Sequence, residues 1–284
     1  MSLIPGLVAP QAEDALRIAG FLQRFAGVST ADLSLVVERQ RKGEMRFSEA
    51  VFDLGLATRA MVDAAVSAEG DAQTIQLARP SLLLKVGHDA FHPHSERIRA
   101  LRTELLLRSG PATSQTLAVV SAGAGEGRSV LAAELAIAFA QLDEPTLLVD
   151  ADLRRPSQHH LFNADNRRGL GSLAAGEPPC LQAVEGLPQL AVLTAGPSLA
   201  SPQDLLGGPR MAHWLRHWAA GYRHIVLDTS AAADNADALT LAGRIDAVLP
   251  LARRHHSSMP ALKTLLERLR AAPARQLGAV LLEF

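Results

Sequence analysis

The stretch Ser121-Ala-Gly-Ala-Gly-Glu-Gly-Arg-Ser-Val130 decides the fold, because three glycines stand where an apolar strand gives way to a helix. We expect the strand over 117–121 and the helix over 128–142. Backbone N–H groups of such a loop, together with the helix N-terminus, bind phosphate oxygens. The loop departs from G-x-x-x-x-G-K-[ST] because Ala122 replaces the first glycine and Arg128 the lysine. Taken alone, it is also compatible with a glycine-rich turn that binds nothing.

Acidic side chains follow two further expected strands. The segment 146–150 ends in Asp150, with Asp152 two residues later, and the segment 224–228 ends in Asp228. The carboxyl ends of parallel strands meet at one edge of the sheet, where open α/β sheets bind their ligands. Carboxylates at that edge hold Mg²⁺ or accept a hydroxyl proton. Each segment alone is compatible with a solvated turn, but the three strand ends together predict a nucleotide site.

Apolar segments alternate with amphipathic ones over 93–284, which predicts an α/β fold with a mostly parallel sheet and helices on both faces. A charged helix is expected over 95–108, and further strands over 247–252 and 278–282. Because proline lacks the N–H that a strand ladder uses, Pro250 predicts a local irregularity in the first of these strands.

Four parts are expected along the chain: a flexible N-terminus, a small helical module, a linker and the α/β domain. Their expected bounds are 1–19, 20–70, 71–92 and 93–284. In the module, Leu33, Val36 and Val37 fit one face of a helix. We interpret this module as a docking or packing unit and predict no ligand for it.

Composition excludes several classes of protein. With 284 residues, 48% of them hydrophobic and 20% charged, the chain can bury a sizeable core. Its 28 Lys and Arg against 29 Asp and Glu argue against a nucleic-acid binder. The single cysteine, Cys180, excludes an internal disulfide. No apolar run reaches the roughly 18 residues of a membrane span, and residues 1–14 lack the pattern of a secretory signal. We therefore expect a cytoplasmic protein that reaches a membrane only through a partner.

At these motifs the region 90–284 resembles the bacterial tyrosine kinase family of exopolysaccharide synthesis. In that family an altered phosphate loop precedes a strand ending in D-x-D-[LM]-R and a later strand ending in D-T-P-P. The counterparts here are 125–130, 150–156 and Asp228-Thr229. A narrower resemblance, to the chain length determinant protein tyrosine kinase subfamily of the EpsG type, rests on Gln40-Arg41, Gly43, Arg46-Phe47 and Glu49-Ala50.

The resemblance implies a P-loop NTPase-like, ATP- and Mg²⁺-dependent protein-tyrosine kinase that acts with a membrane-bound polysaccharide chain-length determinant. It implies catalytic roles for Asp150, Asp152 and Arg128, without deciding which aspartate is the base. Metal ligands would be Ser129, Asp150 and Asp228. Contacts to ATP would come from the loop, namely Gly123, Ala124, Gly125, Glu126, Gly127, Arg128, Ser129 and Val130.

A helix motif of the same family, E-x-x-R-x-x-R, mediates ring-like self-association. It is matched here by Glu96, Arg99 and Arg102, for which an ordinary solvated helix face is the alternative. A homo-oligomer is therefore a further expectation.

Several residues depart from the family pattern. Ser230 and Ala231 replace the two prolines of D-T-P-P, and Leu282 stands where an asparagine near the nucleobase is usual. The usual C-terminal tyrosine cluster is absent, and Tyr222, the one tyrosine, is expected to serve in packing. Phosphorylation of a tail is therefore not expected. We interpret His255-His256 as polar loop residues.

Two alternatives to an active kinase stay open. The departures at Arg128, Ser230 and Leu282 favour a degenerate nucleotide-binding regulator or scaffold of the same machinery. A partition-type ATPase is less favoured, because such proteins carry a second lysine near the start of the loop and 121–123 has none.

Overall fold

Eight strands form one sheet, in the order β3-β4-β2-β5-β1-β6-β7, with β8 pairing to β6 beyond β7. The computed structural model describes residues 12–67, 77–110 and 114–283. The strands are β1 (Gln115–Ser121), β2 (Thr146–Asp150), β3 (Leu181–Val184), β4 (Leu187–Leu193), β5 (His224–Asp228), β6 (Ala247–Arg253), β7 (Arg275–Gln276) and β8 (Val280–Leu282). All of the pairs are parallel except β3–β4, which confirms the expected α/β class.

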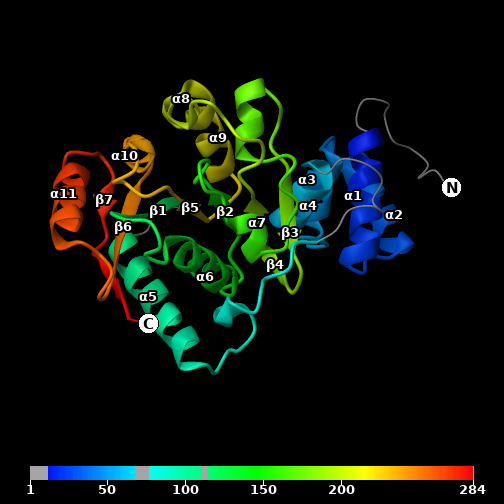
Figure 1. Ribbon diagram of the computed structural model, residues 1–284. Coiled ribbons are helices and arrows are strands. Elements are labelled where there is room, and N and C mark those ends of the chain that lie inside the picture. Colours follow the sequence, from blue (N-terminus) through cyan, green and yellow to red (C-terminus); the bar gives the residue numbers. More distant parts are fainter. Residues whose placement is uncertain (1–11, 68–76, 111–113, 284) are drawn as a thin grey trace.

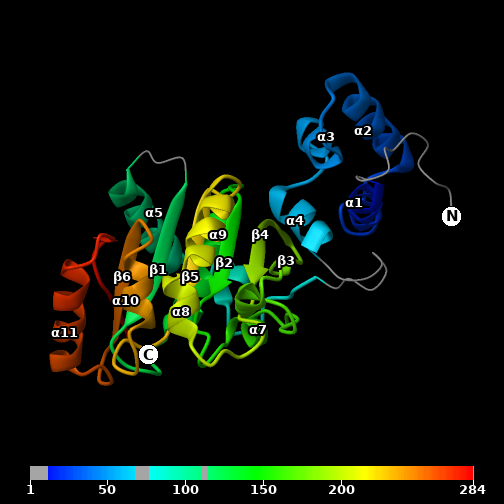
Figure 2. The same ribbon diagram turned by 90° about the horizontal axis from the view of Figure 1, so that it is seen from above.

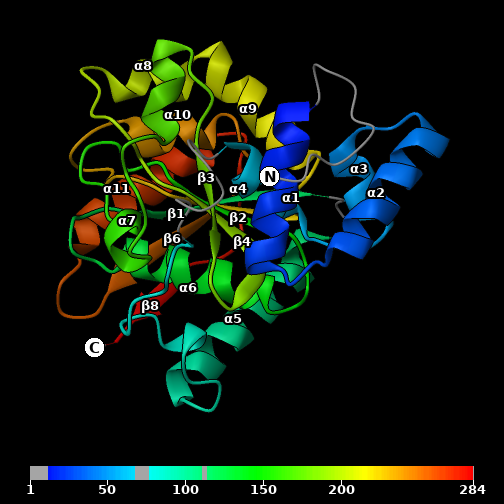
Figure 3. The same cartoon turned by 90° about the vertical axis from the view of Figure 1, so that its right-hand side faces the viewer.

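Helices cover both faces of the sheet (Figures 1 and 3). The helices are α1 (Ala12–Phe25), α2 (Thr30–Gly43), α3 (Phe47–Asp53), α4 (Arg59–Ser67), α5 (Pro93–Ser109), α6 (Arg128–Ala140), α7 (Gln158–Leu161), α8 (Pro202–Gly207), α9 (Pro209–Ala219), α10 (Asp237–Ala242) and α11 (Met259–Arg270), with short 3-10 helices η2 (Lys85–Gly87) and η3 (Leu170–Ala175). One apolar core joins α5 and α6 to the sheet, and another joins α8 to α11 to the opposite face. Within the described ranges, no helix is both long and apolar enough to cross a membrane.

The antiparallel hairpin β3–β4 is a part of the sheet that the sequence did not lead us to expect. Its strands are joined through Glu185 and Gly186, and Gly186 has a φ of +74°, which favours glycine. Pro188 near the start of β4 hides the strand pattern, because proline is rare within strands. The hairpin places the edge of the sheet beside the N-terminal helices.

The irregularity expected at Pro250 lies in the neighbouring strands. Strand β6 is continuous and pairs with β1 along its length, with Pro250 opposite Val120. On its other side, β7 pairs with Ala247 and Val248, and β8 begins only at Leu251. The carbonyl of Val248 accepts from Leu277, and the N–H of Arg254 donates to Leu282, so both point toward the β7–β8 side of β6. Alternate residues of a strand point to the same side, so the position where Pro250 lacks an N–H faces the gap between β7 and β8. The proline therefore interrupts no ladder hydrogen bond.

Helices α1 to α4 form a module that stands beside the β3–β4 edge (Figure 2). Helix α1 begins at Ala12, so residues 12–19 of the segment expected to be flexible are helical. Ala15, Ile18 and Leu22 repeat at helical spacing and are buried in the core of the module. This repeat begins the helical module at or before Ala12, ahead of the expected boundary at residue 20. Residues 1–11 lie outside the described part.

Residues 77–92 of the expected linker are held against the α/β domain. The N–H of Ala78 donates to the carbonyl of Ala183 on β3 (2.9 Å), and that of Ser81 to Leu161 (2.7 Å). Further on, the N–H of Lys85 donates to the buried Glu134 on α6 (3.0 Å). Only Ala78 pairs with the sheet edge, and the rest of this segment is turns and the 3-10 helix η2, so it has no helical periodicity although it is bound to the domain. Residues 68–76 are not among those described.

Candidate functional site

The glycine loop forms one wall of the site. Gly125 and Gly127 have φ values of +73° and +95°, a conformation that side chains disfavour, and α6 begins directly after Gly127. Residues at and just after the C-terminal end of β6 contact two carbonyls of the loop. Arg253 donates to the Gly125 carbonyl (3.2 Å), and the His256 ring nitrogen lies 3.1 Å from the Ala124 carbonyl oxygen. His256 was expected to be a polar loop residue, because its nearness to the loop depends on the pairing of β1 with the distant strand β6.

The two acidic strand ends lie side by side, since Asp150 of β2 pairs in register with Asp228 of β5. Gln158, which begins α7, connects these ends to the loop. Its Nε2 donates to Oδ2 of Asp228 (2.9 Å) and to the backbone carbonyl of Ser129 (3.0 Å). This fully buried glutamine was not among the predicted site residues.

Asp150 lies beneath the turn that follows β2 and is fully buried. Its carboxylate accepts the backbone N–H groups of Asp152 (3.2 Å), Ser157 (3.0 Å) and Gln158 (2.9 Å). Burial and the neighbouring Asp228 raise the pKa of Asp150 well above its usual range. Asp150 thus fixes the shape of the turn and is not among the residues that line the cavity.

Asp152 does face the cavity. Its Oδ1 accepts the backbone N–H groups of Arg154 (3.3 Å) and Arg155 (3.0 Å), which fixes the orientation of the carboxylate. Its Oδ2 lies 3.5 Å from Nη2 of Arg128. Of the two aspartates in the motif, Asp152 is therefore the one placed to meet a ligand.

The carboxylate of Asp228 is fully buried behind Ser129, and burial raises its pKa to about 6. Arg128 and hydrogen bonds from Ser129 and Gln158 act in the opposite direction. Among the described residues, Oδ1 of Asp228 has no hydrogen-bond partner. A carboxylate oxygen that accepts no hydrogen bond, close to Ser129, fits Mg²⁺, which takes one or two carboxylates and completes its shell with phosphate and water. In the described part of the chain, no group of three or more His, Cys, Asp or Glu side chains could hold a metal ion without further ligands.

Arg128, the residue at the lysine position, points into the protein and is only 7% exposed. Its Nε donates to the Thr229 carbonyl, and its Nη1 to the Ser121 hydroxyl and the Gly123 carbonyl (3.2 Å). Nε also lies 4.0 Å from Oδ1 of Asp228. The guanidinium therefore ties the loop to the ends of β1 and β5 from within.

These elements enclose a cavity of about 350 Å³, within the roughly 300–1,000 Å³ of small-molecule sites. It is lined by Ala124, Gly125, Arg128, Ser129, Asp152, Arg154, Arg155, Ser157, Ser230, Ala231, Asp234 and Asn235. The other predicted loop contacts, Gly123, Glu126, Gly127 and Val130, are not among its lining residues. Glu126 is buried, and Val130, within α6, packs partly buried against the core. The sequence did not single out Arg154, Arg155, Asp234 and Asn235 as site residues.

Two of the residues that depart from the family pattern, Ser230 and Leu282, make defined contacts. The Ser230 hydroxyl donates to Oδ1 of Asn235 (2.7 Å), so this turn is held by a side-chain bond where the family has prolines. Leu282 packs against the core on the α5–α6 face.

The predicted self-association helix is α5, and its three motif residues differ in position. Glu96 is mostly exposed and pairs with Arg99, 2.5 Å away. Arg102 instead donates to the Ala138 carbonyl at the end of α6 (2.7 Å). That bond satisfies one of the carbonyls that a helix end leaves unpaired.

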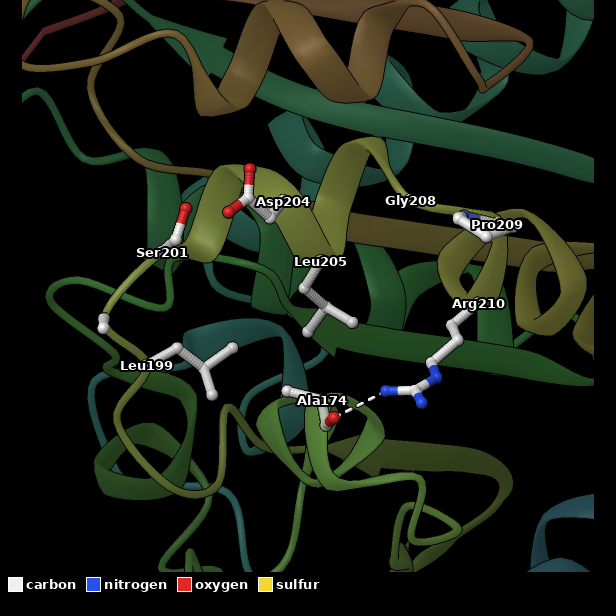
Figure 4. Close-up of a pocket in the computed structure, with 9 residues that line it drawn as sticks. Ala174, Leu199, Ser201, Asp204, Leu205, Gly208, Pro209 and Arg210 are labelled. Atoms are coloured by element: carbon white, nitrogen blue, oxygen red, sulfur yellow. Dashed lines mark hydrogen bonds between the residues drawn. The ribbon is translucent and has the colours of Figure 1, made fainter.

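A second cavity, of about 540 Å³, lies between η3, α8 and α9. Figure 4 shows Leu199, Leu205 and Ala174 pointing toward it. Arg210 also lines this cavity, and its guanidinium donates to the Leu173 and Ala174 carbonyls. Because this cation is already engaged, the cavity offers apolar surface and lacks the convergent chemistry of the phosphate loop.

Comparisons with known proteins agree with this geometry. No family model matches the chain. The tyrosine-protein kinase YwqD of Bacillus subtilis is 34% identical over 191 residues, which are 66% of this chain and 80% of that protein. The crystal structure of the chimerical protein CapA2B2 aligns with a TM-score of 0.67 and 29% identity, over 72% of this chain and 92% of that one. The kinase domain of the Escherichia coli tyrosine kinase ETK aligns with the same score and 27% identity, over 74% and 82%.

Proposed function

The chain belongs to the bacterial tyrosine-protein kinase family, and from this premise we propose that it transfers the γ-phosphoryl group of ATP to tyrosines of other proteins. We further propose that it serves exopolysaccharide synthesis, beside a membrane-bound chain-length determinant. The role in exopolysaccharide synthesis and the membrane partner are proposed from the sequence resemblance. The geometry of the site supports the phosphoryl transfer.

One observation carries the proposal: the glycine loop, Asp152 and the β5 end line a single cavity at the carboxyl edge of the sheet. A phosphate bound there meets the N–H groups at the start of α6. The position suits a nucleotide, because ligands of open α/β sheets bind at this edge.

Ser129 and Asp228 are the residues that would hold Mg²⁺ in this site. The ion supplies positive charge to the phosphates when bound. Gln158 fixes the Asp228 carboxylate through its Oδ2, which leaves Oδ1 for a further partner. The three residues come from α6, β5 and α7, so the site forms only in the folded domain.

In this proposal Asp152 takes the proton of an incoming tyrosine. The tyrosine O–H proton passes to a carboxylate oxygen of Asp152 as the phenolic oxygen forms its bond to the γ-phosphorus. The bond from that phosphorus to the bridging β–γ oxygen breaks, and ADP carries away its electron pair. The two N–H groups on Oδ1 hold the carboxylate in place for this step.

The test is Mg²⁺-dependent ATP binding and turnover by the purified chain, with and without the cytoplasmic segment of the membrane partner. Tyrosine phosphorylation of a protein substrate that Asp152→Asn abolishes while ATP binding persists is the expected result. Binding without any turnover would contradict a kinase.

A second function is favoured by the internal contacts of Arg128. A loop cation bound to Thr229, Ser121 and Gly123 gives less charge to the phosphates. The chain would then bind nucleotide and regulate its partner without catalysis. In that case turnover is absent in the native chain and appears in Arg128→Lys.

A further inference from the structure

Three arginines line the phosphate cavity, and they differ in how firmly the protein holds them. The loop residue Arg128 is the most buried. Each of its guanidinium nitrogens contacts an acceptor within the protein, through Thr229, Ser121 with Gly123, and Asp152. A guanidinium has five N–H donors and no way to shed its charge, so these contacts fix it where it lies.

Arg154 is also held in place. Its Nε and Nη2 donate to the two carboxylate oxygens of Asp237, over 2.7 and 3.2 Å. Asp237 is 1% exposed. Removing Arg154 from it would leave a buried carboxylate without its cation, which is costly. The Arg154 side chain is 41% exposed, but it cannot turn toward a phosphate without leaving Asp237, and Arg128 cannot turn without leaving its own acceptors.

Arg155 differs from both. Its backbone N–H is fixed on Oδ1 of Asp152 (3.0 Å), but its side chain is 71% exposed. The guanidinium lies 3.6 Å from Asp234, which is itself 46% exposed. Such an exposed ion pair contributes little and is readily exchanged.

We propose that Arg155 is the residue that binds the terminal phosphates of the nucleotide, in the role that the loop cation does not fill here. The proposal rests on the proposed function and assigns a specific contact within it. The planar guanidinium matches a phosphate group with two parallel hydrogen bonds. Its backbone anchor on Asp152 keeps this charge beside the carboxylate that takes the proton.

Asp234 acts in this arrangement as the resting partner of Arg155. The incoming phosphate exchanges with this carboxylate, and the ion pair opens without exposing any buried charge. The pair thus lowers nucleotide affinity by a modest amount and keeps the guanidinium at the cavity wall.

The experiment is calorimetric titration of ATP, ADP and AMP in Mg²⁺ buffer into the native chain and its variants. Arg155→Ala is expected to weaken ATP binding by about 10- to 100-fold, the range of one hydrogen bond to a charged group. The loss should be smaller for AMP, and Arg155→Lys should restore part of it. Asp234→Asn should bind ATP more tightly than the native chain.

The matched control is Arg79→Ala. Arg79 is 72% exposed and pairs with Glu185, but it lies on the segment beside β3 and away from the cavity. It should leave ATP affinity unchanged, and circular dichroism verifies that each variant is folded. Native affinity in Arg155→Ala would overturn this inference alone, whereas a native chain that binds no nucleotide would overturn the proposed function with it.

Discussion

The phenolic oxygen of Tyr222 donates a hydrogen bond of 2.9 Å to Oδ2 of Asp63, joining the one tyrosine of the chain to the N-terminal module. Oδ2 of Asp63 also accepts a hydrogen bond from Nε of Arg59 (2.8 Å). Helix α4 also contacts the hairpin, because the Ser67 hydroxyl accepts the Leu181 N–H (2.9 Å). The module is thus attached to the α/β domain by specific polar bonds as well as by apolar packing.

Substitution Tyr222→Phe should remove that bond and lower the free energy of unfolding by ~0.5–1.5 kcal/mol, measured in urea. Burial raises the pKa of Tyr222 well above its usual range, so the hydroxyl is neutral and enclosed. Mass spectrometry should therefore find no phosphate on Tyr222 in the folded chain. A native-like unfolding midpoint in the variant, or a phosphorylated Tyr222, would contradict this assignment.

The raised pKa of Asp228 predicts a pH dependence of stability. A carboxyl group with a pKa of about 6 in the folded chain and 3.8 as its ordinary value binds its proton more tightly when folded. Its stabilising contribution is therefore complete below about pH 4 and is lost as the pH rises through about 6. Two pKa units correspond to about 3 kcal/mol. Asp150 acts in the same direction, because its pKa is also raised.

Urea unfolding at pH values from 4 to 7 should show this loss, with a smaller slope in Asp228→Asn. Binding of Mg²⁺ with ATP should change in the opposite sense, strengthening as Asp228 loses its proton. The same slope in the variant would mean that other groups produce the dependence.

The internal position of Arg128 makes it important for stability. Arg128→Ala leaves Asp152 and Asp228 without their shared cation and should cost about 3–5 kcal/mol. Arg128→Lys keeps the charge but not the planar fork, so its cost should be smaller. In thermal unfolding, Asp228→Asn should recover part of the loss caused by Arg128→Ala. Strict additivity of the two changes would argue against a direct coupling.

The sequence was most informative for residues whose position in space follows from the end of a strand. Asp150, Asp152 and Asp228 were predicted to lie together because parallel strand ends meet at one edge. Asp150 pairs in register with Asp228, and Asp152 and Asp228 both lie within 4.0 Å of the Arg128 guanidinium. The turn after β2 binds both carboxylates through backbone N–H groups, but it encloses Asp150 and leaves Asp152 facing the cavity. Nothing in the spacing of the motif distinguishes the two.

Other features depend on contacts between distant segments. Gln158 and His256 reach the loop from α7 and from the end of β6, so their contacts with it could not be predicted from neighbouring residues. The direction of Arg128 depends on the Thr229 carbonyl, 101 residues further on. The hairpin β3–β4 was missed because Pro188 and short strands hide the alternation of apolar residues.

Gly169 is predicted to tolerate no side chain. A Cβ atom there would lie 2.1 Å from the Thr194 carbonyl oxygen, a backbone atom that cannot move aside. The close approach allows the N–H of Leu170 to bond to Thr194 (2.8 Å) and fixes η3 on the end of β4. Gly169→Ala should lower the melting temperature clearly. Gly87→Ala, whose Cβ would meet only side-chain atoms at 3.5 Å, is the control and should change it little.

The motif on α5 combines a structural residue with exposed ones, which decides how self-association should be tested. Arg102→Ala removes the bond to the Ala138 carbonyl and should destabilise the chain by ~1 kcal/mol, or about 2–4 °C. Glu96→Ala changes an exposed side chain and should leave the melting temperature unchanged. If α5 mediates assembly, sedimentation velocity should show weaker association for Glu96→Ala at native stability. Weaker association for Arg102→Ala alone would trace to the loosened α5–α6 packing instead.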